Sequence, residues 1–471
     1  MIILQSDVRL ADPHICSDAR NRLNIFTAIF DALVRRDDQG NFIPALASSW
    51  QVQPDARHWQ FQLRQDVRFH NGDNLTSADV VASLLRACDP AVGGELGTEG
   101  VWASYLGDAE ISSSGPATVT IVTGRPMADL LDLLVAIPIM PAATLAGLPQ
   151  ELCGSGPYRF VRATATEVEL APFAAAALRQ PAGNEPLIWR AMPAEADRAA
   201  ALLAGEADLA TDLSAASAAQ VKAAGLATLE HQSNLCVAFL FNLIDGAAQD
   251  VRLRQAINYA VDVERMIAQA RAGAATPLNG PLTPWHFGCD PAIPPYPHDP
   301  AKARQLLAEV GFTGRLRVDV PMSLPDEAPL LGQLLAEDLA AVGLEVDLRH
   351  YDDRPAYAQM VKAKQIGDLC CFDSSPLSTY RVLREKINSD VAGPWWQGYA
   401  NADVNKLLDQ AAAAVDDAER QALYRAAYRH MHDEAPWIFL YRPTYFWGLG
   451  RPDLPVSVGA DGFLRLEQHD G

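Results

Sequence analysis

The chain has 471 residues, 49% of them hydrophobic and 20% charged, a composition typical of soluble globular proteins. At roughly 150 residues per domain, that length predicts about three domains. The formal net charge of −20, from 38 basic and 58 acidic side chains, argues against nucleic acid or an anionic membrane surface as a partner.

The N-terminus and the cysteines leave the cellular compartment open. Met1–Asp7 has neither the basic region nor the long apolar run of a secretory signal, so we expect either a cytosolic protein or a mature form whose signal peptide has been removed. No apolar run approaches the roughly 20 residues that a membrane span needs. The seven cysteines include no CxxC pair and are odd in number, so at least one is unpaired and the sequence assigns no disulfide.

The first part of the chain contains short motifs separated by turns. Asp12–His14 is followed by Ile29–Asp37 and by Pro44–Trp50. Apolar and polar residues alternate over Trp59–Phe69, which favours a strand.

The next motif, Val67–Val81 (VRFHNGDNLTSADVV), combines a turn with the start of a helix. Asn71-Gly72 is a turn dipeptide. Thr76 or Ser77 then caps the expected helix, because a short hydroxyl side chain satisfies free N–H groups at a helix start.

Gly154–Tyr158 (GSGPY) forms a second turn cluster. A Gly-Ser-Gly run can cradle a phosphate, but here no Lys-Ser/Thr pair follows and Pro157 lacks a backbone donor. We therefore interpret this cluster as the point where the chain returns into a main lobe as a strand.

The middle of the chain predicts a strand, a helix and a strand over Pro186–Asp212, the helix ending in the pattern Leu-x-x-Gly-x-x-Asp at Leu202–Asp208. Val237–Leu243 is an apolar run that suits a buried strand crossing between lobes.

The stretch 250–311 predicts three helices of scaffold. Asp250 and Asp262 are cap residues ahead of the first two helices. Asp299-Pro300 opens the third helix and Gly311 closes it, which is the usual placement of proline and glycine.

The last part of the chain continues as an α/β pattern. Leu316–Met322, Pro329–Val342 and Leu344–His350 read as strand, helix and strand, and these lengths predict a parallel βαβ unit. Asp403–Arg429 reads as an alanine-rich helix with a break and a new cap at Asp416-Asp417.

In these motifs and in their order, nearly the whole chain resembles the peptide/nickel family of solute-binding proteins of bacterial ABC importers. One family motif, Asn-x-x-Tyr-Trp, is absent, and Ala174–Ala177 stands in its place. The segments that carry the resemblance are Asp12–His14, Ile29–Asp37, Pro44–Trp50, Val67–Val81, Gly154–Tyr158, Leu202–Asp208, Arg254–Asp262, Tyr296–Leu307 and Arg429–Tyr441.

The resemblance implies an α/β fold, that of a two-lobed periplasmic binding protein of the Venus-flytrap type, similar to the large cluster C members and with an additional subdomain. Lobe I would comprise residues 1–37, 154–231 and 442–471, the additional subdomain residues 38–153, and lobe II residues 232–441. The implied mechanism is capture of a small-molecule solute between the lobes by hinge closure, followed by delivery to a membrane permease in the periplasm. We expect a monomer without a cofactor or a resident metal.

The sequence gives little support for an enzymatic function. It contains no G-x-S-x-G, H-E-x-x-H, Walker A or G-x-G-x-x-G motif, and thus no nucleophile with its base. His430 and His432 stand two apart on a predicted helix and point to nearly opposite faces, which argues against joint metal ligation. Cys370 and Cys371 are neighbours in a predicted strand and face opposite sides, so we expect buried structural thiols.

The predicted ligand site is Leu369–Arg381 (LCCFDSSPLSTYR), where a buried strand ends and Asp373 and Ser374 lie at the turn. The stretch resembles the Cys-x-Asp loop of the peptide-binding branch, whose aspartate accepts the ammonium group of the peptide, although the spacing to Pro376 is one residue shorter here. A desolvated carboxylate facing a cleft needs a cation, which an α-amine supplies. The alternative is that Asp373 merely caps the following helix.

The sequence departs from both known branches of the family. Dipeptide-type members carry an arginine for the ligand carboxylate near Met322-Ser323, and nickel-type members carry one near Ile137 with aromatics near Cys370 and Ser374. These arginines and aromatic residues are missing here. The sequence of Arg420–Arg425 nonetheless resembles the nickel-like branch more closely.

If the ligand has a carboxylate, some other arginine must meet it, because the planar guanidinium suits a carboxylate. Arg22 and Arg381 are the candidates, although each also fits a surface role. Trp395, Trp396 and Tyr399 follow as an aromatic cluster that suits either a ligand wall or core packing.

These residues support three hypotheses. The first is a transport receptor for an amino-containing, peptide-like or opine-like solute that binds at Asp373. The second is a nickel or other metal-chelate receptor of the same family, which would require metal-dependent binding. The third is an enzyme, which would require turnover.

Overall fold

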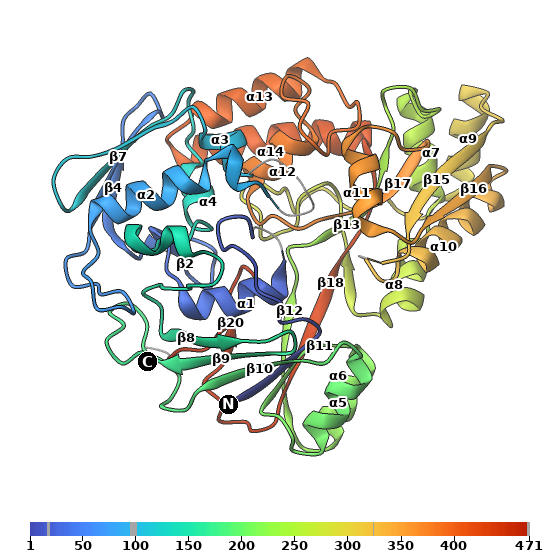
Figure 1. Cartoon of the computed structure of the whole chain (residues 1–471). Helices are drawn as coiled ribbons and strands as arrows, with labels where there is room; N and C mark the ends of the chain where they lie inside the picture. Colours follow the sequence, from blue (N-terminus) through green and yellow to red (C-terminus); the bar gives the residue numbers. More distant parts are fainter. Residues whose placement is uncertain (17–18, 95–100, 324, 469–471) are drawn as a thin grey trace. The chain divides into compact units, whose positions relative to one another are not determined.

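The computed structural model describes residues 1–16, 19–94, 101–323 and 325–468, and it divides into two compact units (Figure 1). Unit 1 comprises Met1–His231 and Tyr445–Gly471, and unit 2 comprises Gln232–Thr444. The chain thus passes from one unit to the other twice, at 231–232 and at 444–445. The finer division into lobe segments and an additional subdomain stays a prediction.

Unit 1 is built on a mixed sheet. Strand β1 (Ile2–Gln5) lies between β10 (Leu187–Ala191) and β11 (Leu209–Leu213) and is parallel to both. Strands β9 (Glu167–Pro172) and β8 (Tyr158–Ala163) extend the sheet beyond β10 in antiparallel order. The strand–helix–strand prediction for Pro186–Asp212 is confirmed, with α5 (Glu195–Leu203) between β10 and β11.

Helices pack on this sheet, and apolar side chains between helices and strands form the core of unit 1. Helix α1 (Arg20–Ile29) buries Ile25 and Ile29 in a cluster that also contains Trp189 and Trp447. Helices α5 and α6 (Ala215–Ala223), which lie side by side in Figure 1, share a smaller apolar cluster with β11.

The segment after residue 46 forms a sheet of its own inside unit 1. Four antiparallel strands follow the order β4 (Ala47–Val52), β5 (His58–Leu63), β7 (Thr118–Val122) and β6 (Glu110–Ser113). Helix α2 (Ser77–Ala87) has Thr76 at its N-cap, as predicted. The remaining short elements, spread over unit 1 with β12 ending at the first residue of unit 2, are β2 (Val34–Arg36), β3 (Phe42–Pro44), η1 (Pro90–Val92), α3 (Ala103–Leu106), α4 (Leu130–Leu134), η3 (Ala142–Gly147), β12 (Ala227–Gln232), β19 (Ser457–Val458) and β20 (Leu464–Arg465).

A buried arginine holds three distant segments of unit 1 together. Arg179 donates from Nε to Oδ1 of Asp31 at 2.9 Å and from Nη1 to Oε2 of Glu467 at 2.9 Å. The Oγ of Ser155 donates to the other oxygen of Asp31 at 2.8 Å. A Cβ on Gly154 would lie 2.1 Å from the carbonyl oxygen of Ile29, so the glycine is required for this close approach. The turn cluster therefore anchors the N-terminal segment.

Unit 2 is a second mixed sheet, in the order β16 (Glu345–Tyr351), β15 (Arg315–Pro321), β17 (Leu369–Ser374), β13 (Cys236–Phe241) and β18 (Trp437–Leu449). Strand β15 runs parallel to β16 and β17, while β13 is antiparallel to β17 and β18. The parallel βαβ prediction is confirmed, because α10 connects β15 to β16. Strand β14 pairs with β18 beyond β13.

Helices cover both faces of this sheet and carry the caps expected from the sequence. Asp250, Asp262 and Asp299 each accept a backbone N–H at the starts of α7, α8 and α9, and Gly311 ends α9 with φ +71°. Asp416 caps α14 after the predicted break. The helices and the remaining strand of unit 2 are α7 (Val251–Ala260), α8 (Val263–Arg271), β14 (Ala275–Pro277), α9 (Pro300–Val310), α10 (Ala328–Ala341), α11 (Arg354–Lys362), α12 (Thr379–Lys386), α13 (Ala402–Ala413) and α14 (Asp417–Glu434).

Two strand predictions were wrong in extent or role. The strand expected over Trp59–Phe69 ends at Leu63, because its partner β7 begins opposite Gln62 and leaves the later residues without a ladder. The strand expected to cross between lobes, β13, lies wholly inside unit 2. Strand β18 continues from unit 2 into unit 1, and β12 ends at Gln232, the first residue of unit 2.

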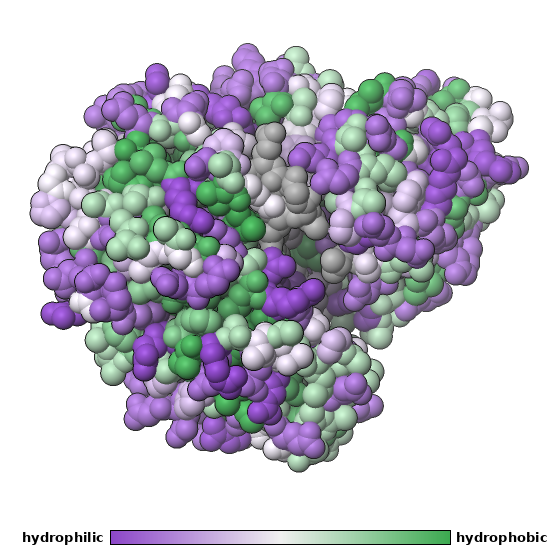
Figure 2. All heavy atoms as spheres, viewed as in Figure 1, coloured by the Kyte–Doolittle hydropathy of each residue, from purple (hydrophilic) through white to green (hydrophobic). Residues whose placement is uncertain are grey.

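Hydrophilic and hydrophobic residues are interspersed over the visible face of the molecule (Figure 2). The exposed large apolar side chains of the described residues lie on different elements or loops rather than on one face: Leu85, Val161, Leu203, Ile244 and Met322.

His14 is buried in unit 1 as a neutral imidazole. Its Nδ1 accepts from Nη1 of Arg86 at 3.1 Å, so its Nε2 carries the proton and donates to the carbonyl of Pro138 at 3.0 Å. Burial lowers the pKa of His14 from 6.5 to about 4.

We therefore expect unit 1 to lose stability as the pH falls from 6.5 to about 4. Over that window the imidazole of His14 is protonated in the unfolded chain but stays neutral in the folded chain. The free energy of unfolding therefore falls by up to roughly 3 kcal/mol. Urea unfolding at a series of pH values measures this loss. His14→Gln keeps one donor and one acceptor but does not titrate, and its dependence on pH should be flatter. An unchanged dependence would exclude His14 as its source.

Candidate functional site

The predicted ligand residue Asp373 lies within strand β17 and not at a turn. Strand β13 pairs with β17 as far as Ser374, opposite Cys236, and this pairing keeps Asp373 and Ser374 in the ladder. The prediction that the strand ends before Asp373 was therefore wrong by two residues. The alternative role is also wrong, because the N-cap of α12 is Ser378, whose side chain accepts from the backbone N of Arg381 at 3.1 Å.

The carboxylate of Asp373 is partly buried, with 23% of its side chain exposed. Its Oδ1 lies 3.8 Å from Nη2 of Arg354, the first residue of α11. This is longer than a charge-assisted hydrogen bond, so the pair is a loose one. Asp373 is thus a partly desolvated carboxylate with a basic side chain nearby.

Ser374 is almost completely buried beside Asp373, with 2% of its surface exposed. Its Oγ has no hydrogen-bond partner among the described residues. A buried hydroxyl without a partner costs about 1–3 kcal/mol, which makes this oxygen a position where a bound molecule would be stabilised.

The loop that follows Ser374 is held by two side chains from other parts of unit 2. Nε2 of His286 is 2.7 Å from the carbonyl oxygen of Pro376. Nδ2 of Asn234 donates to the carbonyl of Ser375 at 2.8 Å. The end of β17 is therefore a fixed surface rather than a free turn.

The two predicted arginines have other contacts. Nε of Arg381, which is 5% exposed, lies 3.6 Å from Oε1 of Glu385 in the same helix. Arg22 belongs to unit 1, and its Nε donates to the carbonyl of Arg9 at 3.1 Å. The other predicted site residues all belong to unit 2.

The predicted aromatic residues Trp395, Trp396 and Tyr399 differ in their surroundings. The ring of Trp395 lies 5.6 Å from that of Phe372, next to Asp373 on β17. Nε1 of Trp396 donates to the carbonyl of Tyr399 at 2.6 Å. Tyr399 itself is 4% exposed and belongs to the apolar core, and burial raises the pKa of its hydroxyl. Trp395 is thus the member placed next to β17.

The sequence reasoning missed Arg442. This residue of β18 is 9% exposed, its Nη2 donates to Oε1 of Gln232, and burial lowers the pKa of its guanidinium. Its Nε has no hydrogen-bond partner among the described residues. The available signal was that Arg442 is the only charged residue in the apolar strand Trp437–Leu449.

The cysteines are structural. Cys371 and Cys370 lie in the two different apolar cores of unit 2, as predicted for neighbours in a strand, and burial raises the pKa of both thiols. Cys153 is only partly buried, whereas six others are buried: Cys16, Cys88, Cys236, Cys289, Cys370 and Cys371.

Within the described ranges, no cluster of three or more His, Cys, Asp or Glu side chains is arranged to hold a metal ion. His432 instead places Nδ1 2.8 Å from the carbonyl oxygen of Asn279 and stacks on Tyr296. Among the helices of the described chain, none has the length and apolar character to cross a membrane.

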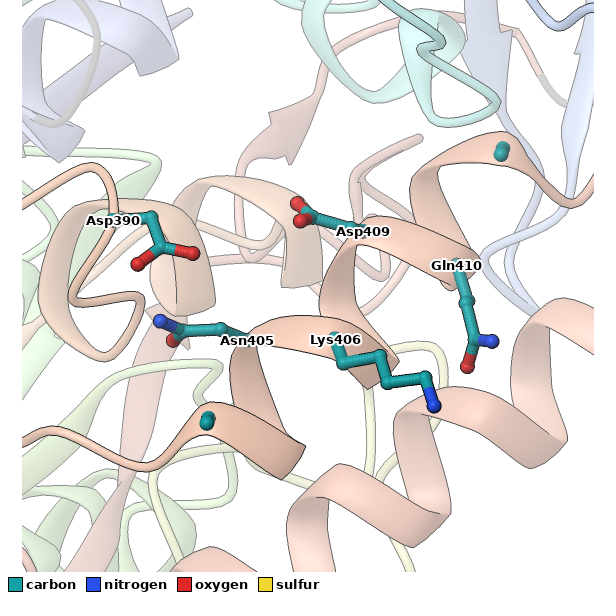
Figure 3. Close-up of a pocket in the computed structure, with 7 residues that line it drawn as sticks. Asp390, Asn405, Lys406, Asp409 and Gln410 are labelled. Atoms are coloured by element: carbon teal, nitrogen blue, oxygen red, sulfur yellow. The ribbon is translucent and has the colours of Figure 1, made fainter.

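A separate surface pocket of about 440 Å³ lies along α13 (Figure 3). In Figure 3, Asn405 and Asp409 point toward Asp390, whereas Lys406 and Gln410 project from the other side of the helix. None of the predicted site residues lines it. Its lining is Asp390, Ala402, Asn405, Lys406, Asp409, Gln410 and Ala413.

Comparison of the sequence with known proteins identifies a matching family and similar proteins. Residues 41–407 match the family model described as bacterial extracellular solute-binding proteins, family 5 Middle. The chain is 27% identical to heme-binding protein A of Haemophilus influenzae over 460 residues, 90% of this chain and 81% of that protein. It is also 27% identical to the glutathione-binding protein GsiB of Pectobacterium atrosepticum over 458 residues, 93% of this chain and 88% of that protein.

The fold also matches a solved structure. HbpA2 from Haemophilus parasuis superposes with a TM-score of 0.85 over 99% of this chain and 99% of that chain, at 21% sequence identity. At this identity the likeness shows a shared fold.

We expect His286→Ala to loosen the end of β17. The change removes the contact to Pro376 and leaves the backbone N of Thr283, which donates to Nδ1 of His286, without its acceptor. The free energy of unfolding should fall by about 1–3 kcal/mol, and amide hydrogen exchange should rise over residues 374–380. His430→Ala, at an exposed position, is the matched control. Unchanged exchange in that segment would show that His286 does not fix the loop.

Proposed function

The chain belongs to family 5 of the bacterial extracellular solute-binding proteins, and we propose that the solute it captures for its ABC importer is a small amino-containing, peptide-like or opine-like molecule. Its fold is the α/β, two-lobed fold of the periplasmic binding proteins. Proteins of this family serve transport rather than catalysis. We further propose a periplasmic location, a monomeric state and delivery of the solute to a membrane permease.

The observation that carries the proposal is the state of the Asp373 carboxylate. It is partly desolvated, Nη2 of Arg354 lies 3.8 Å from its Oδ1, and it stands at the end of β17, where His286 contacts the following loop. An ammonium group that donates to such a carboxylate forms a charge-assisted hydrogen bond, which is about twice as strong as a neutral one. Asp373 is therefore the proposed acceptor for the amine of the solute.

Two neighbours complete the proposed site. The hydroxyl of Ser374 has no hydrogen-bond partner among the described residues, and as the next residue of the strand it would serve a polar group of the solute on the opposite side of β17 from Asp373. Trp395, beside Phe372, offers an amphipathic wall. The roles of Arg22, Arg381, Trp396 and Tyr399 stay predictions, and the buried position of Tyr399 favours packing.

The relatives are compatible with an amine-bearing solute. The protein named as glutathione-binding is 27% identical to this chain over most of its length. Glutathione is a short peptide with a free ammonium group, which is the chemistry that Asp373 suits. The proposed mechanism is closure of the two lobes around the solute, in which contacts made only in the closed state supply the differential affinity.

A thermal-shift screen identifies the solute. The panel contains di- and tripeptides including glutathione, opines, amino acids and nickel chelates, because a binder well above its dissociation constant raises the melting temperature by mass action. Stabilisation by amine-bearing solutes supports the proposal. Stabilisation only in the presence of nickel would transfer support to the metal-chelate hypothesis.

Asp373→Asn should weaken binding of the solute found in this way by at least about tenfold, because the charge-assisted hydrogen bond is lost. Isothermal titration calorimetry measures the change. N-acetylation of the solute removes the ammonium group and should weaken binding to the native protein, with no additional loss in the variant. Asp433→Asn, at an exposed position at the end of α14, is the control. Equal affinities of Asp373→Asn and the native protein would remove Asp373 from the site.

A further inference from the structure

Two arginines of unit 2, Arg425 and Arg442, have no carboxylate partner in the part of the chain that the structure describes. Neither forms an ion pair with any residue that the structure describes, and the Nε of each is buried without a hydrogen-bond partner there. Arg442 is nine-tenths buried, and its Nη2 donates to the side-chain oxygen of Gln232, which is a neutral amide. The guanidinium of Arg442 is therefore a buried cation without a counter-charge.

The two guanidiniums lie on the same face of the unit 2 sheet. Tyr441 packs in one core with Cys371, so Arg442, the next residue of β18, points to the opposite face. That face carries the core to which Cys289 belongs. Burial raises the pKa of the Cys289 thiol to about 11, and the charges of both Arg442 and Arg425 oppose this rise. Helix α14, which carries Arg425, packs into the same core through Tyr424 and Tyr428, so it lies on the face to which Arg442 points.

Other arginines on α14 show that carboxylates are available. Arg429 reaches Asp290, with Nη2 and Oδ2 3.0 Å apart, and Arg420 pairs with Asp417. The whole chain has 58 acidic and 38 basic side chains, so acceptors are in excess. A buried cation without a partner destabilises a fold unless something else supplies the opposite charge.

We propose that Arg442 and Arg425 form an anion subsite of unit 2 that binds an oxyanion of the captured solute. A carboxylate fits best, because its two oxygens match the planar fork of a guanidinium, and a phosphate group offers the same oxygens. The inference rests on the proposed function for the identity of the molecule that carries the oxyanion. It assigns the acidic group of the solute to residues other than Arg22 and Arg381.

The subsite lies where the chain enters and leaves unit 2. Gln232 is the first residue of the unit, and the backbone N of Ser233 donates to the carbonyl of Pro443 at 2.9 Å. The hydrogen bond between Arg442 and Gln232 links the same two segments. Nε1 of Trp285 donates to the carbonyl of Gln232 at 2.9 Å. An oxyanion bound to Arg442 therefore acts directly on both crossing segments.

The test titrates the full-length protein with inorganic phosphate and, separately, with acetate, at constant ionic strength set with sodium chloride. Differential scanning calorimetry follows the melting temperature. We expect phosphate or acetate to stabilise the native protein above the chloride baseline, and Arg442→Gln to lower the apparent affinity at least tenfold. Arg425→Gln should lower it less. Arg304→Gln, at an exposed arginine of α9, should behave as the native protein.

The two anions and a second variant separate the outcomes. A response to acetate assigns the subsite to carboxylates, and a response to phosphate alone assigns it to phosphoryl groups. If Arg442→Gln does not fold, Arg442→Lys keeps the charge but loses the fork, and it should still weaken the response. No response of the native protein, or the same response in the Arg442 variants, overturns the subsite. Because neither probe has an amine, that result would leave amine capture at Asp373 untouched.

Discussion

Strand β18 pairs with β13 and β14 in unit 2 and, further along, with β11 and β12 in unit 1. The backbone groups of one continuous strand, Trp437–Leu449, are therefore satisfied by two different sheets. Strands of both units thus depend on β18 for part of their hydrogen-bond ladder. Of the residues proposed to bind the solute, Arg442 lies on this strand and Asp373 lies on β17, which β13 separates from β18.

The buried arginines of the two units differ in whether a carboxylate neutralises them. In unit 1, Arg179 is held by Asp31 and Glu467, and the charge is neutralised within the fold. In unit 2, the acceptor that the described residues offer to Arg442 is the side-chain amide of Gln232. A neutralised charge serves to join segments of the chain, whereas a charge left without a partner favours binding of an anion from outside. The same residue type thus has a structural role in one unit and a proposed binding role in the other.

Local signals explain how much could be predicted. The caps at Asp250, Asp262 and Asp299 set the helices of the central stretch, because capping depends on a few neighbouring residues. The end of β17 was misplaced, because it is set by pairing with β13, far away in sequence. Arg442 was missed for a related reason. Its sequence shows a charge in an apolar strand, but only the fold shows that no carboxylate of the described chain reaches it.

The burial of the thiols makes the protein suitable for site-specific labelling. Maleimide dyes require an accessible thiolate, and among the cysteines only Cys153 is partly exposed. A Cys153→Ser background would leave little competing reactivity for a cysteine introduced at an exposed position such as Ile244, which is 48% exposed in unit 2. A dye attached there would mark a defined position of unit 2, because the remaining thiols are buried in the cores and compete little for the reagent.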